Sequence, residues 1–184
     1  MTKFGAAALA ALVVLATGSA QDIDSGPKAG EKVTVLKAYG VVGTVEGKEA
    51  DFAAERKNDP TVYLFVQSEH FGRPMARFIK VLDEKLKTAN EKAGVVAVWI
   101  GDKEAFTKNK DYLPRVQMSL KLENTAYAAH EGEKSGPNGW GLNADAHVTV
   151  VVADKGKVAK SFAFVSVNET DVRSVLAAVK GEKK

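Results

Sequence analysis

Histidine is the residue type whose positions first suggest chemistry in this chain, which has 184 residues and three histidines. His70 lies in a polar turn beside Glu69, and His147 lies at the start of an apolar segment. If the fold brings these side chains together, they form two imidazoles and one carboxylate, a ligand set that transition metals accept. However, no two histidines have the i, i+4 or H-x-H spacing of a metal motif. The alternative is that neither binds metal, and that His70 is a residue of a surface turn and His147 a residue at the start of a strand. We expect no metal and no other cofactor.

A hydroxyl nucleophile is the second chemical possibility. Ser68, His147 and Asp145 are candidates for a Ser/His/Asp arrangement, but the chain has no G-x-S-x-G turn, and Ser68 fits a turn or capping residue. The glycine-rich segment 136–141 leads into a strand, so no helix N-terminus is available there to bind phosphate. We expect no catalytic residue and no nucleotide site. Trp140 in this segment either packs down as a lid or offers an aromatic binding surface.

The composition excludes several function classes. The chain has no cysteine, which rules out thiol chemistry, thiolate ligation of metals and iron–sulfur clusters. Its formal net charge is +3, and lysines and glutamates are interleaved, as in Glu84-Lys85 and Lys103-Glu104. This pattern indicates a solvated surface of mixed charge and not a basic patch, so we expect no nucleic-acid binding.

The first twenty residues predict export. Lys3 supplies a positive charge, residues 4–16 are nearly all apolar, and residues 18–20 are small, which is the pattern of a secretory signal peptide. The apolar run is shorter than the roughly 20 residues that a membrane-spanning helix needs, and no cysteine near the cleavage point could carry a lipid. We therefore expect a periplasmic or extracellular protein without membrane contact after cleavage; a retained interfacial helix is the alternative.

Residues 61–86 predict the elements that must position these side chains. Residues 62–66 are apolar and rich in β-branched and aromatic types, which indicates a strand buried on both faces. A polar turn at 67–72 follows. Behind Pro74, which suits the first turn of a helix, apolar residues recur with helical spacing: Met75, Phe78, Ile79, Leu82 and Leu86. The turn is therefore expected at the carboxyl end of the strand, where sites in α/β sheets usually lie.

The rest of the chain predicts one α/β domain over residues 33–180, with an extended lead-in at 21–32 and a basic tail at 181–184. Turn residues and apolar runs place the remaining segments. We expect strands at 33–39, 44–52, 95–100, 123–130, 148–152 and 158–165, a polar bridge at 53–58 and a long loop at 130–146. Strands joined by a helix, as at 62–66 and 95–100, should be parallel.

Helix boundaries are expected at three places. The central helix should end at Ala93-Gly94. Pro114 should divide the next helical segment into one helix at 103–111 and another at 114–121, the second of which buries an apolar stripe of Val116, Leu120 and Met118. Asn168 or Thr170 should cap the last helix, and the same residues form an N-glycosylation motif.

Two stretches of the sequence resemble the thioredoxin-like family, including its peroxiredoxin-like redoxins. Residues 71–75, FGRPM, followed by Leu82-Asp83-Glu84, have the spacing of the family's W-C-x-P-C dithiol motif and its later L-D-E. Trp140-Gly141-Leu142 and residues 147–157 are similar to the redoxin stretch Y-G-V…P-T-x-F-x-I-D-x-x-G-K. The resemblance implies a thioredoxin-like fold, a central mixed β-sheet flanked by helices, with an N-terminal β-hairpin extension. It also places Gly72 and Met75 at the two sulfur positions and His147 at the cis-proline.

The resemblance implies a degenerate site that has lost its redox chemistry. Gly72 has no side chain, and the Met75 thioether neither ionises nor forms a disulfide, whereas redoxin chemistry needs a thiolate. We therefore expect an exported, non-catalytic domain that binds an unidentified protein or small molecule. The expected binding rim surrounds the open helix N-terminus: His70, Phe71, Arg73, Pro74, Trp140 and His147. The alternatives are an extracytoplasmic enzyme with metal- or histidine-dependent chemistry that uses His70 and His147, and a structural component of the cell envelope.

Overall fold

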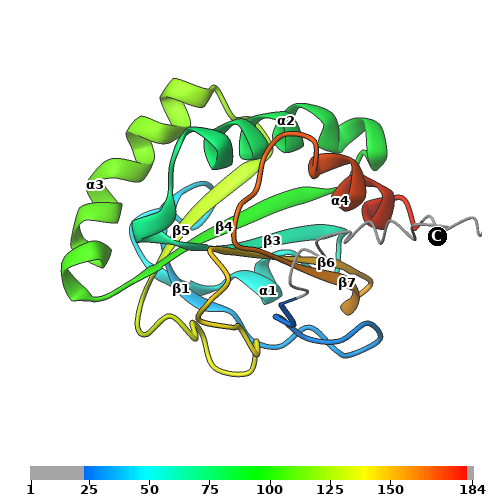
Figure 1. Ribbon diagram of the computed structural model, residues 1–184, viewed down its shortest axis with the longest axis horizontal. Helices are drawn as coiled ribbons and strands as arrows, with labels where there is room; N and C mark the ends of the chain where they lie inside the picture. The colour runs from blue at the N-terminus through cyan, green and yellow to red at the C-terminus, as the bar shows by residue number, and fades with distance from the viewer. Residues whose placement is uncertain (1–22, 182–184) are drawn as a thin grey trace, which may run out of the picture.

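The computed structural model describes residues 23–181 (Figure 1). The predicted signal peptide at 1–20, residues 21–22 of the lead-in and residues 182–184 of the tail lie outside the described residues. The elements follow in this order: β1 (Lys37–Val42), β2 (Glu49–Asp51), α1 (Phe52–Glu55), β3 (Thr61–Gln67), the 3-10 helix η1 (Ser68–His70), α2 (Arg73–Ala89), β4 (Gly94–Gly101), α3 (Lys103–Leu120), β5 (Thr125–Glu131), β6 (Val148–Asp154), β7 (Lys157–Phe164) and α4 (Val172–Val179).

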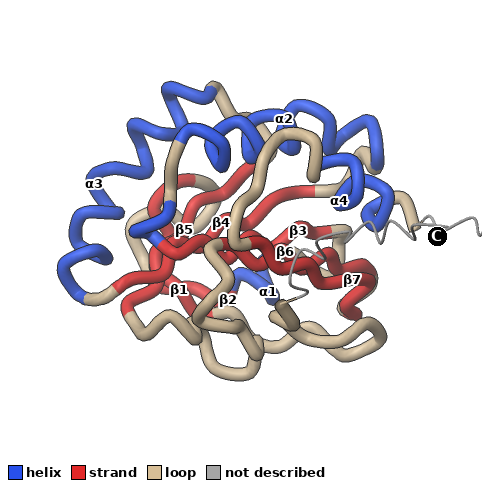
Figure 2. The backbone as a smooth tube through the Cα atoms, in the orientation of Figure 1, coloured by secondary structure: helices blue, strands red, loops and turns tan. Residues whose placement is uncertain are grey.

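A seven-stranded sheet forms the middle of the fold, in the order β2-β1-β5-β4-β3-β6-β7. β4 is parallel to both β3 and β5, whereas β6 and β7 on one side and β1 and β2 on the other continue the sheet with antiparallel pairing. Figure 2 shows α2, α3 and α4 together on one face of the sheet, and the long loops on the other. The predicted mixed sheet with flanking helices and an N-terminal hairpin is therefore confirmed.

β3 lies at the centre of the sheet because both of its faces are buried. Val62, Leu64 and Val66 belong to the core beneath α2, α3 and α4. Tyr63 and Phe65 belong to the core on the opposite face. A continuous apolar run is what a strand covered on both faces requires, since alternate side chains enter opposite cores. The predicted buried strand, parallel to its neighbour β4, is confirmed.

α2 is the amphipathic helix that the sequence predicts after the turn. Gly72 is its N-cap residue, and Pro74 lies in its first turn, where the missing N–H has no helical acceptor to serve. The predicted apolar stripe is buried: Met75, Phe78, Ile79, Leu82 and Leu86. The predicted end at Ala93-Gly94 is wrong, because Asn90 already forms the C-cap and Gly94 begins β4.

α3 is one helix, and the predicted division at Pro114 is wrong. Tertiary packing outweighs the hydrogen bond that proline removes, because Leu113 is fully buried and Val116 is 6% exposed on the core side of the helix. The side chain of Asp102 accepts a hydrogen bond from the Ala105 N–H at 2.9 Å and caps the N-terminus. Met118 is 71% exposed, so its predicted burial is also wrong.

The boundaries near the two ends of the domain differ from the sequence prediction. The first strand begins at Lys37, and the predicted return strand at 44–52 is only the three residues of β2. The predicted polar bridge at 53–58 begins within α1, because Asp51 accepts a hydrogen bond from the Ala53 N–H at 3.0 Å and nucleates a helical turn.

The N-cap of α4 is Asp171 rather than either predicted residue. The Asn168 side chain instead accepts hydrogen bonds from the backbone and the hydroxyl of Thr170, at 2.9 and 2.7 Å, and closes a turn before the helix. Asparagine bonded to the backbone two residues later is a common turn device, which competes with its use as a cap.

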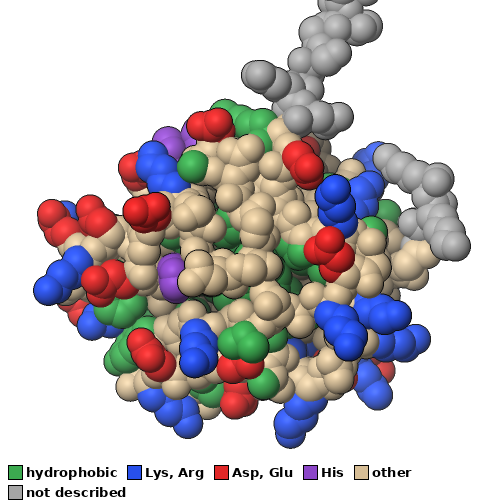
Figure 3. Space-filling view, turned by 90° about the horizontal axis from the view of Figure 1, so that it is seen from below, with side chains coloured by type: hydrophobic (Ala, Val, Ile, Leu, Met, Phe, Trp, Pro, Cys, Tyr) green, Lys and Arg blue, Asp and Glu red, His purple; other side chains and the backbone are tan. Residues whose placement is uncertain are grey.

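The lead-in is attached to the sheet along its β6–β7 edge. The Ser25 hydroxyl, which is buried, lies 2.6 Å from the Thr149 hydroxyl, and the Gly30 N–H donates to the Val158 carbonyl at 2.8 Å. Figure 3 shows acidic and basic side chains intermixed over the face that this segment and the long loops cover. Within residues 23–181, no helix has the length and apolar character to cross a membrane.

Candidate functional site

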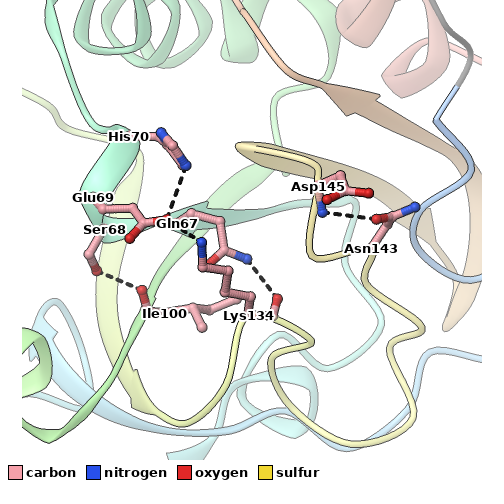
Figure 4. Close-up of polar contacts among 8 residues, drawn as sticks. All are labelled: Gln67, Ser68, Glu69, His70, Ile100, Lys134, Asn143 and Asp145. Atoms are coloured by element: carbon pink, nitrogen blue, oxygen red, sulfur yellow. Dashed lines mark hydrogen bonds and ion pairs between the residues drawn. The ribbon is translucent and has the colours of Figure 1, made fainter.

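The turn between β3 and α2 is anchored at the carboxyl end of the parallel strands. The Ser68 hydroxyl donates a hydrogen bond to the Ile100 carbonyl on β4 at 2.7 Å (Figure 4). It also accepts one from the Asn109 side chain of α3 at 2.8 Å, and Asn109 is only 6% exposed. The turn is therefore tied to two elements besides its own strand and helix, which gives the site a defined backbone.

The structure brings His70 and His147 together. Their rings are stacked, with centroids 3.5 Å apart and planes 13° from parallel. A carboxylate oxygen of Glu69 lies 3.1 Å from His70 Nε2, and the same oxygen pairs with Lys134 from the long loop (Figure 4). The two histidines and Glu69 are predicted from the sequence as neighbours, whereas Lys134 is not. Among the residues the structure describes, no three His, Asp or Glu side chains are placed to hold a metal ion.

The charges of this cluster shift the pKa values of two of its members. Partial burial lowers the pKa of His147, and the neighbouring His70 lowers it further, while a backbone hydrogen bond to Val165 and the Glu69 charge oppose these effects. The hydrogen bond and positive charge of Lys134 hold the pKa of Glu69 below its ordinary value. At neutral pH the cluster therefore presents an ionised carboxylate paired with a lysine, beside an uncharged His147 ring.

Replacing His70 with alanine should raise the pKa of His147, because the change removes both a neighbouring charge and some of the burial that now lower it. An imidazole with a lowered pKa in the folded chain weakens folding in acid. Above the pKa of the unfolded chain, about 6.5, the uncharged His147 leaves the free energy of unfolding undiminished. As the pH falls from there toward the lower pKa of the folded chain, that free energy decreases. NMR titration of the ring protons measures the shift.

His130 is the control for this titration. Burial also lowers its pKa, but it lies on β5 and has Lys37 and Glu49, not His70, among the groups that affect it. Its pKa should be the same in the wild type and the His70→Ala variant. A His147 pKa that does not move in the variant would contradict the stacked arrangement.

Gly72 and Met75 occupy the first turn region of α2. Gly72 is exposed, and a Cβ added to it would contact only the Pro74 ring, at 3.9 Å. Met75, by contrast, is 4% exposed and belongs to the core. No side chain of the described residues caps the helix N-terminus, and its first turn holds no acidic residue, so the helix dipole gives this end an uncompensated positive potential.

The rest of the predicted rim divides between surface and core. Arg73 and Pro74 are exposed in the first turn of α2. Phe71 is half-buried, with its ring edge-on to Trp99 and Tyr112 at centroid distances of 5.1 and 6.2 Å. His70, which directly precedes Phe71, completes this group. The helix N-terminus is therefore bordered by His70, Phe71, Arg73 and Pro74 and by His147.

Trp140 does not join the rim. It is fully buried against Tyr63 and Phe65, with ring centroids 5.1 and 4.7 Å away, and its Nε1–H donates to the Val35 carbonyl at 3.1 Å. Because Tyr63 and Phe65 face away from α2, Trp140 lies in the core on the opposite side of the sheet. The interpretation of Trp140 as a packed residue is correct, and its placement beside the helix N-terminus is wrong.

Two other sequence interpretations have no geometric support. Asp145 closes its own turn, since its N–H donates to the Asn143 side chain at 2.9 Å, and Figure 4 shows it well away from Ser68. Ser68 is committed to Ile100 and Asn109, so the three residues do not form a Ser/His/Asp arrangement. Among the described residues no peptide bond is cis, so the bond before His147 does not reproduce a cis-proline.

Two residues that support the site are not predicted from the sequence, because they bond to residues far away along the chain. The Gln67 side chain donates to the Lys134 carbonyl at 2.7 Å and holds the long loop against the turn (Figure 4). Asn109, which anchors Ser68, lies among charged residues of α3. The residues around Gln67 and Asn109 give no indication of these roles, because the bonded partners Lys134 and Ser68 are 67 and 41 residues away in the chain.

Comparison with known proteins gives a clear result for the fold alone. No protein-family model matches the chain, and no curated protein does. Solved structures do match. A putative thiol:disulfide interchange protein DsbE from Chlorobium tepidum has 16% identity and a TM-score of 0.54, over 83% of this chain and 98% of that chain.

Two further solved structures resemble the chain to a similar degree. A peroxiredoxin-like protein from Aquifex aeolicus has 21% identity and a TM-score of 0.53, over 84% of this chain and 87% of that one. BsSco, of the Sco family of cytochrome c oxidase assembly proteins, has 16% identity and a TM-score of 0.56, over 87% of this chain and all of that one. At these identities the likeness establishes the thioredoxin-like fold, on a chain without cysteine.

Proposed function

We propose that this chain, with its thioredoxin-like fold and no cysteine, is an exported domain that acts by binding and not by thiol–disulfide or peroxidase chemistry. Both chemistries need a thiolate nucleophile, which the printed sequence does not contain. The signal-peptide pattern of residues 1–20 supports export. Structural likeness to a putative thiol:disulfide interchange protein and to a member of the Sco family of cytochrome c oxidase assembly proteins supports a scaffold of the kind that redox proteins use.

The open N-terminus of α2 is the observation that carries the proposal. Gly72, the N-cap residue, has no side chain that could cap the helix, and the exposed Arg73 and Pro74 follow directly. The stacked His70 and His147 border the same point from two separate segments of the chain, η1 and the residue before β6. Exposed aromatic, cationic and amide groups on a fixed backbone are well suited to contact a partner, because little conformational freedom is lost on binding.

Affinity capture with the mature protein tests the binding role. The wild type should retain a partner from an extracytoplasmic fraction, and a His70→Ala/His147→Ala variant should lose it. His130→Ala is the matched control, because this half-buried histidine lies on β5 outside the proposed rim. Circular dichroism establishes that all variants are folded. Equal capture by the wild type and the double variant would overturn the proposed surface.

Two solution assays test the absence of catalysis. Insulin reduction and peroxide consumption should both be blank, since neither proceeds here without a thiolate. Metal analysis of the purified protein addresses the histidine-dependent alternative. Stoichiometric metal that is lost in the His70→Ala/His147→Ala variant would overturn the binding-only function.

A further inference from the structure

An apolar groove lies beside the helix N-terminus, between α2 and α3. Phe71 and Ala76 line one side, and Tyr112, Val116 and Leu120 of α3 line the other, around a cavity of about 250 Å³. Tyr112 is 47% exposed although its ring packs edge-on to Phe71. The groove shares Phe71 with the proposed rim, so a partner bound at the helix N-terminus can extend into it.

One arginine lines this groove, and two more lie close to it in the sequence of α2. Arg115 lines it from α3, while Arg73 and Arg77 lie on the first two turns of α2, next to Ala76. Among the described residues, none of these three side chains forms an ion pair or hydrogen bond. The nearby lysines differ, because Lys80 pairs with Glu84 and Lys108 with Glu104 on their own helices. Asp111, one turn before Arg115 on α3, is an exposed acidic residue on this side, so three arginines against one aspartate leave a net positive charge beside the groove.

We infer that the groove between α2 and α3 binds an acidic peptide segment of a partner protein. One apolar side chain of the segment occupies the cavity between Ala76 and Val116, and flanking carboxylates pair with Arg73 and Arg115. Arginine suits this role because its planar guanidinium binds carboxylates in a bidentate manner. The inference rests on the proposed binding function and specifies the chemistry of the partner.

The chain's own segments outside the described residues fit the groove less well. The tail at 182–184 carries two lysines and one glutamate, so it would bring further positive charge to the arginines. Residues 1–22 contain one acidic side chain, Asp22, and one basic side chain, Lys3, so they bring no net negative charge. Charge complementarity thus favours a separate acidic partner over either end of this chain.

Selection from a phage-displayed library of random short peptides tests the inference on the mature protein. Peptides that combine an apolar residue with flanking Asp or Glu should be enriched. Fluorescence anisotropy of the selected peptide should then show affinity weakened by about tenfold in Arg115→Glu, which places a carboxylate against the peptide's own. Ala76→Leu, which fills the groove with a good helix former, should weaken binding in a similar way.

Arg173→Glu is the matched control, because Arg173 is an exposed arginine of α4 and does not line the groove. It should leave the affinity unchanged. Failure to enrich acidic peptides, or equal affinity for the wild type and Arg115→Glu, would overturn the inference. Self-association that Ala76→Leu abolishes would also overturn it, in favour of a second copy in the groove. The capture experiment with His70→Ala/His147→Ala has a separate readout, so either result can fail without the other.

Discussion

Replacing Asp83 with alanine should lower the free energy of unfolding by about 2–4 kcal/mol. Asp83 is 2% exposed in the middle of α2. Its carboxylate accepts hydrogen bonds from the backbone N–H groups of Glu123 and Asn124, at 3.0 and 2.9 Å, and from the Thr125 hydroxyl at 2.7 Å. Alanine leaves these donors without the carboxylate acceptor, and Thr125 is only 6% exposed, so water replaces the lost bonds poorly. Urea denaturation monitored by circular dichroism measures the loss.

Glu84→Ala is the natural control for Asp83→Ala. Glu84 is the next residue of the same helix, and its exposed side chain pairs with Lys80, at 3.4 Å. An exposed pair of this kind contributes under about 1 kcal/mol, so Glu84→Ala should have a small effect. Asp83→Asn should lie between the two variants, because it keeps one oxygen acceptor and introduces an N–H₂ group that faces other donors. Equal stability of Asp83→Ala and Glu84→Ala would show that the carboxylate does not hold β5 to α2.

Asp83 also marks a limit of sequence-based prediction. In the helical pattern it lies between the buried Leu82 and the exposed Glu84, where a charged residue indicates a solvated face. Its burial depends on donors about forty residues further along the chain, at the start of β5. The resemblance of Leu82-Asp83-Glu84 to a family motif points to the position, but only the fold supplies the reason for a buried carboxylate.

The elements that the sequence predicts well are those whose signal is local. The apolar run of β3, the stripe of α2 and the position of Pro74 in its first turn each depend on neighbouring residues, and each is confirmed. The same local reasoning fails at Pro114 and Trp140. Pro114 remains inside α3 because Leu113 and Val116, on either side of it in the sequence, are buried in the core. Trp140 leaves its glycine-rich loop and packs against aromatic residues of β3.

The site divides in the same way. The turn, its helix N-terminus and the approach of His147 to His70 follow from element order, because the start of β6 lies beside the end of β3 in an antiparallel pair. Lys134 and Gln67 do not follow from it. The long loop that carries Lys134 has no periodic pattern, so its path across the turn depends on individual contacts such as the bond from Gln67.

Introducing two cysteines, by Gly72→Cys together with Met75→Cys, should create thiol–disulfide activity where the wild type has none. The change introduces a C-x-x-C spacing, as in the dithiol motif of thioredoxin-like proteins, at the N-terminus of α2. Gly72 is exposed and has room for a Cβ, and the uncapped helix N-terminus stabilises a thiolate, which should lower the thiol pKa below its free value of about 8.5. Insulin reduction with dithiothreitol as the electron donor measures the activity.

The single variants separate the redox reaction from simple reactivity. Gly72→Cys alone should react with iodoacetamide but should not form an internal disulfide, and Met75→Cys alone should react slowly because position 75 is 4% exposed. Met75→Cys also removes apolar volume from the core, at about 1–2 kcal/mol, so thermal unfolding must show that the double variant is folded.

A folded double variant that reduces no insulin would contradict the assignment of Gly72 and Met75 to the sulfur positions. Activity would place the difference between this chain and a working redoxin in those two side chains, because the strand, turn and helix that present them are already formed. The stacked His70 and His147 would then lie next to a reactive thiol at position 72 and would tune its pKa. In the natural chain the same backbone carries no thiol, and under the proposed function it contacts a partner instead.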